Sequence, residues 1–177
     1  MGLHASYHPI QQSKLVAFIT DVHSEGSLRE MTRFREESVK KGEEFYVGTT
    51  WHVLDFIINT PGASIPELAY AVRGHEFPSP DGSTRLEPHL ASYEDEYWEA
   101  YTYVTSVEAQ KIARHLTLID DAEFRSRFVP EKMESIYRAP LEEEGNDKRY
   151  YYELLEGLQV FYQKVAAREM AVLIAVS

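Results

Sequence analysis

The sequence predicts one α+β domain over residues 1–177, in which several helices pack on a small mixed sheet that includes the N-terminal and C-terminal strands. Three stretches indicate strands: the alternating residues 3–7, the aromatic and β-branched residues 98–104, and the continuous apolar run 170–176. The length of 177 residues, with 44% hydrophobic and 27% charged, suits one globular domain with a single core.

The N-terminal segment shows the pattern of one strand followed by two helices. Residues 3–7 alternate and Pro9 closes them, which predicts a short strand. Residues 11–20 have one apolar side and predict a helix. Residues 24–41 are highly charged with a thin apolar stripe, which predicts a mostly solvated helix that ends near Gly42. The apolar residues of these two helices are Leu15, Val16, Phe18, Ile19, Leu28, Met31 and Phe34.

Two further helices and a loop are predicted in the middle of the chain. Residues 50–59 form an apolar helical run that Pro61 and the following glycine stop. A second helix starts at Ser64, which is a capping residue type, and ends at Gly74. Residues 77–89 hold three prolines and predict an irregular loop. The second helix is expected to bury Leu68, Ala69 and Val72.

The strand at residues 98–104 is expected to lead directly into a helix. Thr105 and Glu108 have the spacing of a capping box, in which each side chain bonds the other residue's backbone N–H. Residues 120–137 then predict two short helices that are broken near Pro130. The helix that starts after Thr105 is expected to bury Ala109, Ile112, Ala113 and Leu116.

The C-terminal part is expected to contain a long helix and the last strand. Residues 142–147 predict an acidic linker, and residues 148–168 predict the helix. Of its first three tyrosines, two are expected to face the core while Tyr152 stays exposed. The run 170–176 predicts a strand that is buried on both faces. The apolar face of the helix holds Tyr150, Tyr151, Leu154, Leu155, Leu158, Phe161, Tyr162 and Val165.

The composition excludes several classes of function. The chain has 18 basic and 29 acidic side chains, a net charge of −11, which argues against nucleic-acid binding and favours a basic protein partner. It has no cysteine, which excludes thiolate catalysis and Cys-ligated metal sites. No signal peptide, membrane span, phosphate-binding glycine motif or metal motif is found, so we expect a cytoplasmic protein without a cofactor or metal and without membrane contact.

Several segments, in order along the chain, resemble the YfbM-like bacterial family, a domain of unknown function. They are the Met-Gly-Leu start that runs into a strand, Trp51-x-x-Leu54 with the following Thr-Pro-Gly, the segment from Leu68 to Gly74, the strand-to-helix segment that begins at Tyr103, and the Tyr/Leu-rich last helix with its apolar strand. The resemblance implies an α+β fold and no established activity. It also places Asp55 where the family often has a histidine, which puts any role of that histidine in doubt here.

His52, Asp55 and Asn59 are the first candidate site. On a helix these residues fall within a narrow polar arc, beside otherwise apolar sides. The functional interpretation is a histidine oriented by Asp55 that acts as a general base, or half of a metal site. The structural interpretation is a hydrogen-bonded polar edge of the core, and it is favoured because no nucleophile or third metal ligand is placed by the sequence.

His4, Ser6 and His8 are the second candidate site. On a strand, His4 and His8 lie about 13 Å apart, which is too far to share one metal ion. The three side chains share a face and are expected to line a shallow ligand pocket if they have a function. A structural role is favoured for them as well.

The acidic and aromatic segment at residues 93–101 is the candidate partner-binding surface. Aromatic anchors with a charged rim are typical of protein interfaces, whereas charge alone also protects an edge strand from aggregation. Its residues are Tyr93, Glu94, Asp95, Glu96, Tyr97, Trp98, Glu99 and Tyr101.

Two functions follow from these sites. The favoured hypothesis is a non-enzymatic binding protein, similar in role to an immunity protein or an antitoxin, with a basic partner. The alternative is a small enzyme or ligand-binding protein that combines the His52 and Asp55 pair with His4, Ser6 or His8 in one pocket.

Overall fold

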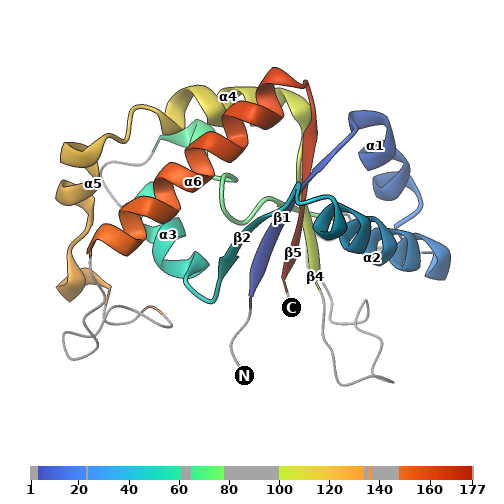
Figure 1. Ribbon diagram of the computed structural model, residues 1–177, viewed down its shortest axis with the longest axis horizontal. Coiled ribbons are helices and arrows are strands. Elements are labelled where there is room, and N and C mark those ends of the chain that lie inside the picture. The colour runs from blue at the N-terminus through green and yellow to red at the C-terminus, as the bar shows by residue number, and fades with distance from the viewer. Residues whose placement is uncertain are drawn as a thin grey trace.

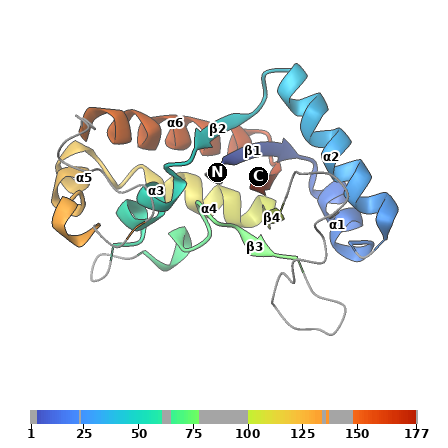
Figure 2. The same cartoon turned by 90° about the horizontal axis from the view of Figure 1, so that it is seen from below.

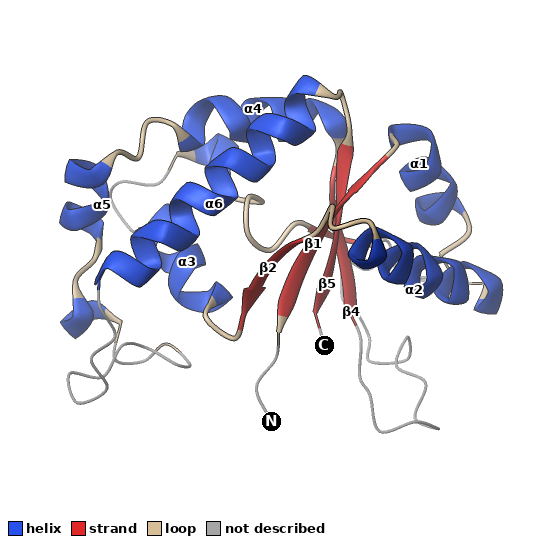
Figure 3. Ribbon diagram, in the orientation of Figure 1, coloured by secondary structure: helices blue, strands red, loops and turns tan. Residues whose placement is uncertain are grey.

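A five-stranded antiparallel sheet forms the centre of the protein (Figure 3). The computed structural model describes residues 4–22, 24–60, 65–77, 100–133, 136 and 148–176. The strand order is β2-β1-β5-β4-β3. The strands are β1 (Ala5–Ile10), β2 (Phe45–Gly48), β3 (His75–Glu76), β4 (Ala100–Val104) and β5 (Ala171–Val176).

The expected α+β fold with both terminal strands in the sheet is confirmed, and its mixed character is wrong. β1 and β4 run in the same direction, but β5 lies between them and pairs antiparallel with both. The order of the strands cannot be predicted from this sequence, so the position of β5 between β1 and β4 was not expected. The last strand of the chain is therefore the central one.

Helices cover both faces of the sheet (Figures 1 and 2). One layer contains α3 (Trp51–Ile58), α4 (Ser106–Leu116), α5 (Asp121–Arg127) and α6 (Lys148–Ala167), and the other contains α1 (Gln12–Thr20) and α2 (Glu25–Lys40). Each layer has its own core. The larger core includes Tyr7, Val172 and Ile174, and the smaller one includes Ile10 and Leu173.

β5 shows why the C-terminal run is continuously apolar. Residues 171–175 are all buried, and successive side chains enter the larger and the smaller core in turn. The predicted strand buried on both faces is confirmed.

The prediction that Pro9 ends the first strand is wrong, because β1 continues to Ile10. Pro9 pairs opposite Val172 of β5, whereas the pairs between β1 and β2 stop at Tyr7. At Pro9 the strand therefore has a neighbour on one side only. A residue without a backbone N–H is tolerated at such an edge position.

The helix predicted to end at Gly74 is replaced, in its described part, by a 3₁₀ turn, Pro66–Leu68, and further turns. Two buried tyrosine hydroxyls hold the backbone here: Tyr7 donates to the carbonyl of Val72, and Tyr162 donates to that of Ala71, each at 2.8 Å. Both tyrosines are distant from this segment in the sequence, and their hydrogen bonds attach the two carbonyls to the core. Ala71 is consequently buried, while Ala69, which was expected to face inward, is exposed.

Gly74 ends these turns in a conformation that favours glycine. Its φ is +65°, and an added Cβ atom would lie 2.9 Å from the carbonyl oxygen of Tyr103. The chain can therefore pass directly into β3, which pairs with β4.

The helices of the second half follow the prediction closely. The capping box of Thr105 and Glu108 is present at the start of α4, and α5 is followed by a 3₁₀ turn, Pro130–Lys132. One detail of α6 is wrong: Tyr150 is exposed, whereas Tyr152 packs against Phe124 of α5 with ring centroids 5.2 Å apart. The helix α5 packs on Tyr152, and the periodicity of α6 alone does not predict the position of α5. The predicted loop at 77–89, apart from Phe77, and the acidic linker at 142–147 lie outside the described residues.

Candidate functional site

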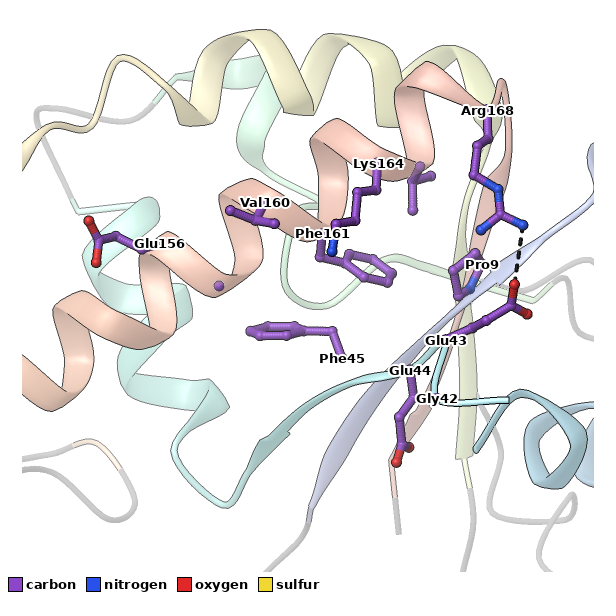
Figure 4. A pocket seen from close by; sticks show the side chains of 12 residues that line it. Pro9, Gly42, Glu43, Glu44, Phe45, Glu156, Val160, Phe161, Lys164 and Arg168 are labelled. Atoms are coloured by element: carbon purple, nitrogen blue, oxygen red, sulfur yellow. Dashed lines mark hydrogen bonds and ion pairs between the residues drawn. The ribbon is translucent and has the colours of Figure 1, made fainter. Parts of the chain in front are cut away.

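An open groove of about 480 Å³ runs between α6 and β2 (Figure 4). The turn that precedes β2 closes one end of it. The lining residues come from three separate segments of the chain and are Pro9, Gly42, Glu43, Glu44, Phe45, Glu156, Gly157, Val160, Phe161, Lys164, Val165 and Arg168.

Aromatic rings form the floor of the groove. Phe45 of β2 and Phe161 of α6 stack with ring centroids 5.8 Å apart, and Tyr7 lies 6.0 Å from Phe161. Gly157 makes room for this arrangement, because a Cβ atom there would lie 2.7 Å from the ring of Phe45. Val160 stands at the lip with 47% of its surface exposed. The floor is therefore an apolar surface that an incoming side chain can contact.

Charged side chains surround this floor. Arg168 and Glu43 form an ion pair of 3.2 Å across one end of the groove (Figure 4). Within the described part of the chain, Glu44, Glu156 and Lys164 form no ion pair. Two carboxylates and one ammonium are therefore left to meet a ligand.

β2 gives the groove a free strand edge. It is the terminal strand of the sheet, so among the described strands its outer edge has no neighbour. Edge strands are commonly protected by proline, lysine or other charged residues, and β2 contains none of these. Tyr46, on the opposite face from the groove, is 55% exposed and stacks on His4. β3, at the other end of the sheet, is only 2 residues long.

The structure brings Ser6 and His8 together, away from the groove. Both side chains lie on the side of α1 and α2, and Ser6 Oγ is 2.9 Å from His8 Nε2. His4, the third member of the predicted set, instead bonds the hydroxyl of Tyr46 through Nδ1. Tyr46 pairs opposite Ser6, so His4 lies next to the other two residues, but within the set only Ser6 and His8 bond each other.

The environment of His8 makes it a weak base. It is fully buried, and burial followed by the charge of Arg35 lowers its pKa from 6.5 to about 4. Its Nδ1 is buried without a hydrogen-bond partner in the described structure. A histidine in this state is neutral near pH 7 and holds a proton poorly, which does not suit general-base catalysis.

Asp55 has two hydrogen-bond partners, Asn59 and Arg73. Asn59 Nδ2 donates to Oδ1 at 3.0 Å, and Arg73 Nε donates to Oδ2 at 2.7 Å. The sequence placed Asn59 beside Asp55 but missed Arg73. The arginine follows the 3₁₀ turn, so only the fold brings it to α3.

His52 lies at the start of α3, where its ring stacks on that of Trp51 with centroids 3.5 Å apart. Burial and the nearby Arg73 lower the pKa of His52, while Asp55 opposes this shift. α3 belongs to the layer of the larger core, whereas Ser6 and His8 face the other layer. The sheet therefore lies between the two candidate groups that the alternative hypothesis combined in one pocket.

Most of the predicted partner-binding segment, residues 93–99, lies outside the described residues. Tyr101 is the exception. It is buried in β4 beneath α2, where its hydroxyl lies 3.1 Å from Thr32 Oγ1. The prediction that Tyr101 lies on an exposed surface is therefore wrong. Side chains of β4 alternate between the two faces of the sheet, and Tyr101 lies on the face of the smaller core.

Sequence reasoning also missed the groove itself. Its walls come from residues around 43–45 and 156–168, which no motif connects. One signal was present: Gly157 interrupts an otherwise strong helix, and glycine inside a helix costs about 1 kcal/mol relative to alanine, so it indicates a packing reason. Among the described residues, no group of three His, Asp or Glu side chains is arranged to hold a metal ion, and no helix is long and apolar enough to cross a membrane.

Comparisons with known proteins identify the fold. A family model described as a domain of unknown function, DUF1877, matches residues 1–175. The crystal structure of YfbM from Escherichia coli, a protein of unknown function, is similar over 98% of this chain and 99% of that chain, with a TM-score of 0.58 and 16% identity. At this identity the likeness shows the fold alone. None of the curated proteins matches the chain.

Proposed function

Because the chain belongs to the DUF1877 family, whose description assigns no activity, we propose a function from the geometry. The protein binds a basic partner protein without acting on it chemically. The groove between α6 and β2 receives the partner.

The apolar floor of the groove carries this proposal. Phe45 is partly exposed beside the groove and stacks on Phe161, which is only 7% exposed, and Val160 extends the apolar surface. Interfaces use aromatic and aliphatic anchors in partly enclosed pockets, with charges at the rim. The groove has this composition.

The charge of the partner follows from the rim and from the whole chain. Glu43 and Arg168 pair with each other, which leaves Glu44 and Glu156 against Lys164. The rim is thus negative by one charge, and the chain carries −11. Such a field attracts a basic protein and speeds its association.

A pair of valine variants tests the site. Val160→Arg puts a bulky cation at the lip of the groove and should abolish capture of the partner from a lysate of the native host. Val107→Arg on α4 is the matched control, because Val107 is also an exposed helix residue, at 61% against 47% for Val160. Quantitative mass spectrometry compares the proteins that each immobilised variant retains.

The expected result is a basic protein that wild type and Val107→Arg retain and Val160→Arg does not. If the wild type and both variants retain the same proteins, the groove is not the binding site. If the retained proteins that depend on Val160 are acidic, the proposed class of partner is wrong.

A further inference from the structure

We propose that the partner segment binds as an added β-strand on the free edge of β2, with the side chain beside Phe45 entering the groove. This inference rests on the proposed function and specifies how the groove holds its ligand. The ligand is then an extended segment that carries an apolar residue flanked by basic ones.

The edge of β2 supplies the backbone half of this interaction. β2 pairs with β1 on one side only, and its four residues, Phe45–Gly48, have no neighbouring strand on the other side within the described structure. An extended chain can use this edge to form main-chain hydrogen bonds, which give affinity without requiring a particular sequence.

The two faces of β2 decide where the ligand's side chains go. Phe45 pairs with Tyr7, and both rings lie on the face of α6. Tyr46 pairs with Ser6 and points to the opposite face. Side chains of an added strand alternate in the same way. The ligand residue beside Phe45 therefore faces the groove.

The groove meets β2 at Phe45, the one β2 residue in its lining, and extends from there past the preceding turn beside α6. Glu156 and Lys164 stand on the same helix, and their separation of eight positions corresponds to about 12 Å along α6. An extended chain covers this distance with about four residues. β2 itself has 4 residues. A segment that pairs with β2 can thus continue past Phe45 beside α6, where its side chains contact the groove.

The charges along α6 give the bound segment a direction. Glu156 stands toward one end, whereas Lys164 and the paired Arg168 stand toward the other (Figure 4). A lysine or arginine of the ligand is favoured beside Glu156. An apolar residue is favoured over Phe45 and Phe161. A second copy of this chain fits less well, because each copy carries −11.

Two N-methylated peptides test the strand pairing. The probe is a capped hexapeptide of alternating lysine and valine. One derivative is methylated at the backbone nitrogens of the lysines, and the other at those of the valines. In an added strand, only one of these two sets of N–H groups faces β2. We therefore expect one derivative to bind at least about tenfold more weakly than the other, since it loses two or three hydrogen bonds.

Hydrogen exchange of the complex provides the second readout. The unmethylated probe should slow exchange of the β2 amides in wild type and in Val107→Arg, but not in Val160→Arg. Equal binding of both methylated peptides overturns strand addition, while the partner-capture experiment keeps its own result. Failure of the unmethylated probe to bind also overturns it. So does a dimer in solution that Val160→Arg dissociates, because the edge is then occupied by a second copy.

Discussion

The Cβ atom that Gly157 lacks would lie 2.7 Å from the ring of Phe45. Gly157 stands within the 20-residue helix α6, and Phe45 opens the edge strand β2. The absence of a side chain at one residue thus allows the ring of the other to lie against the helix. The floor of the groove depends on this contact.

A double-mutant cycle should show that these two residues are coupled. Gly157→Ala gains about 1 kcal/mol of helix propensity but must push the ring of Phe45 aside. In a Phe45→Leu background the obstruction is smaller, so the same change should stabilise the protein by about 0.5–1 kcal/mol. We expect Gly157→Ala to be less favourable in the wild type by at least about 1 kcal/mol in the free energy of unfolding. Equal effects in the two backgrounds, measured by urea denaturation, would show that the ring does not fill this space.

His8 should make the stability of the protein depend on pH. Its pKa in the folded state is about 4, below the ordinary 6.5, so between these values the unfolded chain binds a proton that the folded protein does not. Stability contributed by neutral His8 is therefore present above about pH 6.5 and is lost as the pH falls toward 4. The loss amounts to about 2 kcal/mol at about pH 5 and about 3 kcal/mol in full.

The variant His8→Leu isolates this effect, because the other histidines remain. Urea denaturation at about pH 7 and about pH 5 should show a smaller loss of stability in the variant, by about 2 kcal/mol. Removing the orphan Nδ1 should also leave the variant at least as stable as wild type at the lower pH. A variant that loses as much stability as wild type between the two pH values would mean that His8 titrates normally.

The hydrogen bond between Asp55 and Arg73 should stabilise the attachment of α3. Asp55 is buried and Arg73 is more than half exposed, so the arginine can return to water when the pair is broken. We expect Asp55→Asn to destabilise the protein by about 1–2 kcal/mol. The double variant with Arg73→Ala should show a coupling of about 0.5–2 kcal/mol. Additive effects of the two single changes would show that the ion pair contributes nothing to stability.

Patterns local in sequence predicted most of the fold. The capping box of Thr105 and Glu108, the two-sided burial of residues 171–175 and the ends of α1 and α2 each depend on neighbouring residues, and all are confirmed. The predictions that failed concern segments whose conformation depends on contacts with distant parts of the chain. Tyr7 and Tyr162 bond the carbonyls of Val72 and Ala71, so side chains from distant parts of the chain hold the turns that replace the helix predicted to end at Gly74.

The candidate sites show the same division. Ser6 and His8 are two residues apart on one strand, and their shared face was predictable. Their separation from Asp55 was not, because it depends on which face of the sheet receives α3. The groove joins segments more than 100 residues apart, from Phe45 to Gly157, and only the paired strands and the long helix bring them together.

The position of β5 at the centre of the sheet leads to a prediction about two adjacent residues. Leu173 enters the smaller core and Ile174 enters the larger one, and both are fully buried. Leu173→Ala and Ile174→Ala should therefore each destabilise the protein by about 2–5 kcal/mol, because each leaves a cavity in a packed layer. Val16→Ala, at a residue that is half exposed on α1, is the control and should change the free energy of unfolding by less than about 1 kcal/mol. If either core variant behaves like this control in urea denaturation, one face of β5 is open to solvent, and the two-layer arrangement of the helices is wrong on that side.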